Sequence, residues 1–126
     1  MPTDIEKMSQ FILTVHSDVF ASQTSRSAYK FAQTLLMQSH ELLGIFFYQQ
    51  GVLHANASNQ LAEDELNTQQ LFTQLSQEYN VRLMVCSTAA EQRGINSDNL
   101  AEGFQLAGLA EFAALTGKAD RMVQFK

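Results

Sequence analysis

Cys86 is the only thiol among the 126 residues, and it lies in the stretch "VRLMVCSTAAEQRGI", residues 81–95. A strand-like apolar run ends at this cysteine and a helix-like run follows it. The first free N–H groups of such a helix, those of Ser87, Thr88 and Ala89, would favour a thiolate over a thiol. The thiolate is the nucleophilic form of a cysteine side chain. Cys86 is therefore either a reactive nucleophile or a small apolar packing residue in a buried strand.

Two charged side chains follow the cysteine within the next two helical turns, namely Glu91 and Arg93. A nearby carboxylate opposes ionisation of a thiol, whereas a nearby guanidinium favours it. The sequence leaves open which of the two lies nearer to the sulfur.

Three histidines are candidates for a base that would activate the thiol, as a cysteine protease or a transglutaminase requires. His16 ends a predicted strand and His54 lies in the loop after the next strand, so both are candidate site-lining residues, as is Tyr48. The alternative for both histidines is a solvated position at the edge of a loop. His40, at the end of a predicted helix, is expected to cap carbonyl groups or to face water.

The remaining residues show no pattern that predicts a cofactor site or a metal site. One cysteine and three dispersed histidines lack the paired spacing of metal ligands. The segment "SQTSRS", residues 22–27, offers hydroxyls to a phosphate, as in flavin-binding domains, but it has no glycine where the backbone would approach the ligand. We interpret it as a loop that caps the following helix, and we expect neither a cofactor nor a metal.

Composition predicts a soluble protein of the cytoplasm. The formal net charge is −5, and the scattered Lys and Arg residues form no cationic stripe, so direct binding to nucleic acid is not expected. No apolar run approaches the roughly 20 residues that a membrane-spanning helix needs. The first ten residues do not resemble a signal peptide, and one cysteine makes no internal disulfide. We expect a flexible tail over residues 1–8 and a single domain over residues 9–126.

The pattern of apolar residues predicts alternating strands and helices. Near-continuous apolar runs predict strands at 10–17, 41–50, 80–87 and 119–126. Helical spacing predicts helices over 25–40, from Asp64 or Glu65 to Leu75, in a short segment after Cys86 that ends at Gly94, and, as one or two helices, over 97–117.

This order of elements predicts an α/β fold. We expect a three-layer α/β/α sandwich with a mostly parallel sheet of about five strands. Ligands and chemistry collect at the carboxyl ends of the strands in such sheets, and Cys86 lies at one of these ends.

Five stretches carry a resemblance that runs from about Gln10 to Phe125: "RSAYKFAQTLL", "ELLGIFFYQQGVLHAN", "VRLMVCSTAAEQRGI", "GFQLAGLAEF" and "DRMVQF". Together they resemble the DsrE-like sulfur-relay family, and its TusD branch most closely. The resemblance implies a sulfurtransferase in which Cys86 accepts sulfane sulfur as a persulfide and relays it to a partner protein. Because the chain has no second cysteine, the sulfur must leave to a thiol of another protein.

The resemblance also implies partners. TusB-like and TusC-like subunits would complete a heterohexamer, a TusA-like protein would donate the sulfur, a TusE-like protein would accept it, and 2-thiouridine at tRNA wobble positions would be the end product. A homo-oligomer is the alternative for the isolated chain. Two other functions stay open, a DsrE-type subunit in dissimilatory sulfur oxidation and a non-catalytic assembly subunit in which Cys86 is only packed.

Overall fold

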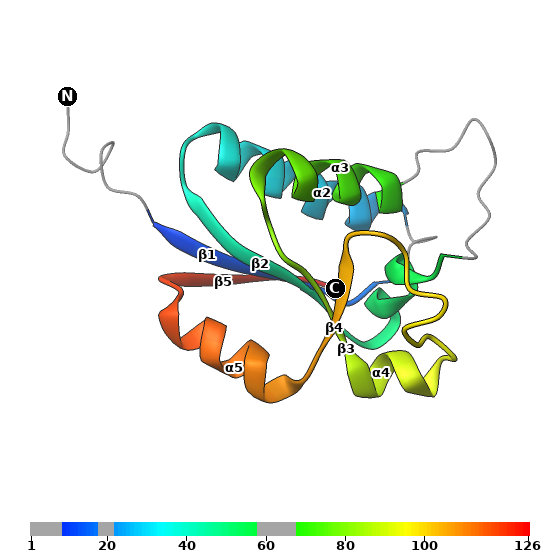
Figure 1. Ribbon diagram of the computed structural model, residues 1–126. Helices are drawn as coiled ribbons and strands as arrows, with labels where there is room; N and C mark the ends of the chain where they lie inside the picture. Colours follow the sequence, from blue (N-terminus) through cyan, green and yellow to red (C-terminus); the bar gives the residue numbers. More distant parts are fainter. Residues whose placement is uncertain (1–8, 18–21, 58–67) are drawn as a thin grey trace, which may run out of the picture.

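Five strands form one parallel sheet in the computed structural model, which describes residues 9–17, 22–57 and 68–126 (Figure 1). They are β1 (Gln10–Val15), β2 (Glu41–Phe47), β3 (Leu83–Cys86), β4 (Phe104–Ala107) and β5 (Arg121–Phe125). The strand order is β4-β3-β2-β1-β5, and every neighbouring pair is parallel. The predicted sheet is thereby confirmed. The predicted tail, residues 1–8, lies outside the described residues.

Helices cover both faces of the sheet. In Figure 1, α2 (Ser22–Met37) and α3 (Thr68–Tyr79) lie on one face and α5 (Leu109–Lys118) lies on the other, so the predicted three layers are confirmed. The short helix α4 (Ser87–Gln92) follows β3, and a 3₁₀ helix, η1 (Gln49–Ala55), follows β2. Both lie where the strands end, which we call the carboxyl edge. In the described ranges, no helix has the length and apolar character to cross a bilayer.

The continuous apolar run of β2 follows from this layering. Neighbouring residues of a strand point to opposite faces, so both sets must be apolar when helices cover both faces. Phe46 stacks on Phe112 of α5 with ring centroids 4.2 Å apart, whereas Phe47 meets Phe72 of α3 edge-on at 5.3 Å. Both phenylalanines of β2 are almost fully buried.

The prediction of only helices over residues 97–117 is wrong, because β4 occupies Phe104–Ala107 before α5 begins. Its outer residues Phe104 and Ala107 are buried while the two between them are exposed. Four residues show too little of a period to separate a strand from a helical turn. The predicted helix start at Ser97 or Asp98 is a turn instead, in which the Asn96 N–H donates to Asn99 Oδ1 at 2.7 Å.

Several other boundaries differ from the predictions. Helix α2 includes Ser22–Ser27, so the "SQTSRS" segment is helical and not a loop. A 3₁₀ helix occupies part of the predicted loop after β2. The predicted helix start at Asp64 or Glu65 lies outside the described residues. Gly94 does end α4 as predicted, with a left-handed φ of 76° that suits glycine.

Candidate functional site

Cys86 is the last residue of β3 and the N-cap residue of α4. Its side chain makes no capping hydrogen bond, and the residue is only 1% exposed. Because α4 begins at once, the N–H groups of Ser87, Thr88 and Ala89 have no acceptor within the helix. The thiol therefore belongs to the residue at the N-terminal end of α4, where the first N–H groups of the helix lack an intrahelical acceptor.

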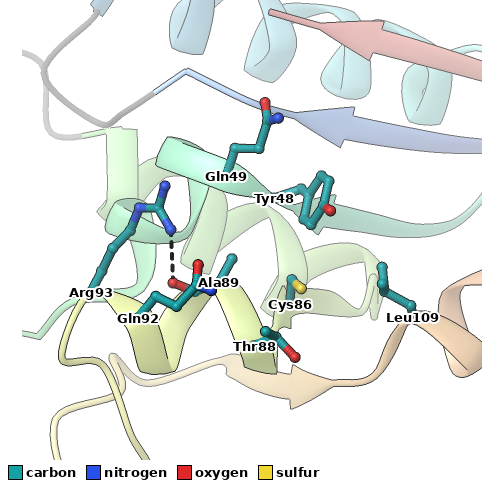
Figure 2. A pocket seen from close by; sticks show the side chains of 8 residues that line it. All are labelled: Tyr48, Gln49, Cys86, Thr88, Ala89, Gln92, Arg93 and Leu109. Atoms are coloured by element: carbon teal, nitrogen blue, oxygen red, sulfur yellow. Dashed lines mark hydrogen bonds between the residues drawn. The ribbon is translucent and has the colours of Figure 1, made fainter.

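A pocket of about 200 Å³ opens beside this thiol at the carboxyl edge (Figure 2). Its lining comes from segments that follow the ends of three neighbouring strands, β2, β3 and β4, the place where ligands collect in open parallel sheets. Figure 2 shows the sulfur of Cys86 directed into the space between the side chains on either side of it. The lining residues are Tyr48, Gln49, Cys86, Thr88, Ala89, Gln92, Arg93 and Leu109.

Tyr48, a predicted site-lining residue, lies in this pocket with Cys86. Its ring meets His16 edge-on, with ring centroids 5.8 Å apart. His16 itself is not among the residues that line the pocket. Its Nδ1 lies 3.1 Å from Gln49 Oε1 and its Nε2 lies 3.1 Å from Thr14 Oγ1. His16 therefore contacts two residues that line the pocket, Tyr48 and Gln49, without lining it itself.

The structure places His54 in the core and not in the pocket. Its Nδ1 lies 2.9 Å from the Gly51 carbonyl oxygen, which only accepts, so Nδ1–H donates, and its Nε2 lies 2.7 Å from the Ser25 hydroxyl oxygen. The ring packs beside Phe47 and Phe72, which are on the α3 face. His54 thus joins η1 to α2 and lies on the face of the sheet opposite to the thiol.

His40 lies at the other end of the sheet, directly before β2 begins. Its Nδ1 accepts a hydrogen bond from the Ser9 N–H at 3.2 Å, and its ring meets Phe11 edge-on at 5.4 Å. This position separates it from the chemistry at the carboxyl edge.

Arg93 lines the pocket and Glu91 does not, so the guanidinium and not the carboxylate is the charge at the pocket. The Arg93 side chain is held in place, because Nη1 donates to the Ala89 carbonyl at 3.0 Å and Nε donates to Gln50 Oε1 at 3.5 Å. The course of α4 therefore puts Arg93 and not Glu91 among the residues that line the pocket.

Three pocket residues escape sequence reasoning: Gln49, Gln92 and Leu109. Gln49 adopts a left-handed φ of 53°, and the "QQG" after an apolar run is a turn signal that would have pointed to it. Leu109 begins α5 one residue after β4 ends, and a prediction that makes β4 helical gives no reason to place Leu109 at the carboxyl edge.

Comparisons with known proteins agree with this fold. A sulfurtransferase TusD homolog from Vibrio parahaemolyticus is 41% identical, over 91% of this chain and 96% of that protein. A second one, from Haemophilus influenzae, is 38% identical over 90% of this chain and 98% of that protein. Among solved structures, the ychN protein from E. coli has the same fold, with a TM-score of 0.82 at 23% identity over 94% of this chain and 100% of that one.

A family model described as DsrE/DsrF-like matches residues 9–125, which include every strand of the sheet and the pocket at its carboxyl edge. The match covers almost the whole chain, and the relatives align over nearly their full lengths. The chain therefore belongs to the DsrE/DsrF-like family.

Proposed function

We propose that this chain is a sulfurtransferase subunit that accepts sulfane sulfur as a persulfide on Cys86 and relays it to a partner protein. The observation that carries the proposal is the position of the only thiol in the chain. It lies at a pocket on the carboxyl edge, in a protein whose relatives are named sulfurtransferase TusD.

The reaction is a pair of thiol–persulfide exchanges. The Cys86 thiolate attacks the terminal sulfur of a donor persulfide, R–S–SH, the donor S–S bond breaks, and the donor leaves as a thiolate that takes up a proton. The loaded protein carries Cys86–S–SH. An acceptor thiolate then attacks the terminal sulfur and Cys86 leaves as a thiolate, so the sulfur moves on without net oxidation or reduction of the protein.

The residues around the thiol suit this chemistry. Backbone N–H groups of Ser87, Thr88 and Ala89 would stabilise negative charge on the sulfur in both exchanges. Arg93 adds a positive charge to the pocket lining. A pocket of about 200 Å³ has room for an additional sulfur atom while it keeps the thiol away from bulk solvent.

The relatives named TusD support a pathway for the proposal. We place the subunit in the cytoplasm, in a heterohexamer with TusB-like and TusC-like chains, with a TusA-like donor, a TusE-like acceptor and tRNA 2-thiouridine as the end product. Since the chain has no second cysteine, discharge within the chain as a disulfide is impossible and a partner's thiol must take the sulfur.

One observation favours a second candidate function, that of a non-catalytic assembly subunit. Cys86 is only 1% exposed, as a purely packed cysteine would be. Such a subunit would join the complex without carrying sulfur.

The two candidates differ in one mass measurement. After incubation with a persulfidated donor protein, the wild-type chain should gain the mass of one sulfur atom and Cys86→Ser should gain none. An identical adduct on Cys86→Ser would show that Cys86 does not carry the sulfur. Assembly of the wild-type chain with its partners in the absence of any adduct would favour the scaffold.

A further inference from the structure

We infer that the hydroxyl of Tyr48 donates a hydrogen bond to the terminal sulfur of the Cys86 persulfide and so stabilises the loaded state. This inference rests on the proposed function, and it assigns a catalytic role to a side chain of the pocket other than the thiol. Three observations carry it: the register of β2 and β3, the fixed orientation of the ring, and the hydrogen-bonding state of the hydroxyl.

The strand register brings the two side chains to the same level. Strands β2 and β3 pair in parallel, with Phe47 opposite Val85. The pairing ends there, but Tyr48 is still extended, with φ −133° and ψ 157°, so continuing the register by one residue sets Tyr48 opposite Cys86. Paired residues point to the same face, and neighbouring strands lie about 4.8 Å apart. Both residues line the pocket, and Figure 2 shows Tyr48 and Leu109 flanking the cysteine.

The ring of Tyr48 is held by its neighbours. His16 meets it edge-on with an interplanar angle of 78°, and Phe46 lies on another side with its ring centroid 6.0 Å away. The backbone is fixed as well, because the Tyr48 N–H donates to the Val15 carbonyl at 3.0 Å and the Tyr48 carbonyl accepts from the Gly51 N–H at 2.8 Å. Such support orients a side chain before its ligand arrives.

The hydroxyl of Tyr48 is available as a donor. Within residues 9–17, 22–57 and 68–126 it makes no hydrogen bond to another protein group, whereas two of the N–H groups of Arg93 are bonded to Ala89 and Gln50. A phenolic O–H donates readily, and a hydrogen bond to an ionised group is stronger than one between neutral groups. The other hydroxyl of the pocket, that of Thr88, belongs to an exposed residue, where water competes for it.

The expected effect is on the loading equilibrium. In this equilibrium R–S–SH and the Cys86 thiol exchange to give R–SH and Cys86–S–SH, whose terminal sulfur releases its proton to solvent. A hydrogen bond to that ionised sulfur lowers the free energy of the loaded state only. The unloaded thiol gains nothing from it, so the bond shifts the equilibrium toward loading.

The test uses Tyr48→Phe, which keeps the ring and removes the hydroxyl. The matched control is Tyr29→Phe, because the Tyr29 hydroxyl is bonded to Gln33 on α2 and its ring packs on Phe72, on the opposite face of the sheet. Each purified chain is equilibrated with cysteine persulfide and the loaded fraction is measured by intact mass. Tyr48→Phe should lower the loading constant about ten-fold, the usual effect of one lost hydrogen bond to a charged group, and Tyr29→Phe should match the wild type.

A second measurement separates the hydrogen bond from a change in pocket shape. Iodoacetamide should alkylate the unloaded Cys86 of Tyr48→Phe and of the wild type at the same rate. Equal loading constants for these two chains would overturn the role of Tyr48 while the proposed function stands. An equal drop in the alkylation rate and the loading constant of Tyr48→Phe would also overturn it. A ten-fold lower loading constant in Thr88→Val, with no change in Tyr48→Phe, would do the same. A wild-type chain that takes up no sulfur would overturn both the inference and the proposed function.

Discussion

Cys86 is a buried residue whose thiol is the proposed nucleophile. A residue that is 1% exposed resembles a packed core residue, yet its sulfur lines a pocket of about 200 Å³. Access to the thiol is therefore limited by the size of the reagent and not by a lack of any path. In the same way, the three histidines separate into a support behind Tyr48, a core residue and a residue at the far end of the sheet.

This geometry predicts that alkylation of Cys86 depends on reagent size. We compare the rate of alkylation by iodoacetamide with the rate of alkylation by a fluorescein maleimide. The ratio of the first rate to the second should be about ten-fold or more higher in the native protein than in urea. The pocket admits the small reagent and excludes the large one. Rates measured by intact mass in native buffer and in urea test this. The same ratio of rates under both conditions would show that the thiol is freely exposed.

Among the elements, η1 brings Gln49 to the pocket, begins directly after Tyr48 and contains Gly51. A Cβ at Gly51 would lie 1.9 Å from the carbonyl oxygen of Val15, a backbone atom that also accepts the Tyr48 N–H. From the other side, His54 ties η1 to the core through the Ser25 hydroxyl. The glycine is required because β1 and η1 approach each other so closely.

Gly51→Ala should therefore destabilise the protein. Overpacking against backbone that cannot move lowers the free energy of unfolding by about 1–3 kcal/mol, as measured by urea denaturation. The matched control is Gly117→Ala in the last turn of α5, where a Cβ meets nothing within 4 Å and helix propensity should add up to about 1 kcal/mol. Equal stability of Gly51→Ala and the wild type would contradict the close approach.

At the scale of the whole molecule, α5 forms its own layer and has no fully buried residue. Two of its contacts with the rest of the molecule come from adjacent residues. Phe112 stacks on the buried Phe46, and Glu111 forms an ion pair with Arg82, whose side chains are 45% and 40% exposed. Solvent-exposed ion pairs contribute little, so apolar contact should dominate the attachment of this layer.

The adjacent positions 111 and 112 allow a direct comparison. Phe112→Ala should lower the free energy of unfolding by about 2–3 kcal/mol, somewhat less than truncation of a fully buried phenylalanine. Glu111→Ala should change it by less than about 1 kcal/mol, with a smaller effect in high salt. Urea denaturation of both variants measures the difference. A larger loss in Glu111→Ala than in Phe112→Ala would show that the ion pair holds the layer.

Local patterns in the sequence were enough for most of the sheet. Apolar runs indicated β1, β2, β3 and β5, because strands covered on both faces are apolar along their whole length. They failed for β4, where two exposed residues separate Phe104 from Ala107 and the segment is too short for a period to show. The first turn of α2 was missed because Ser and Thr residues are common in loops as well as at helix starts.

The sequence by itself determined the class of fold, the family and the one thiol at the end of β3, because these depend on local order along the chain. Only the tertiary structure decided the neighbours of that thiol. Strand order and register brought Tyr48, Gln49 and Leu109 to Cys86, the course of α4 put Arg93 and not Glu91 at the pocket, and packing placed His54 in the core. Such contacts join residues far apart in the chain, and no local pattern encodes them.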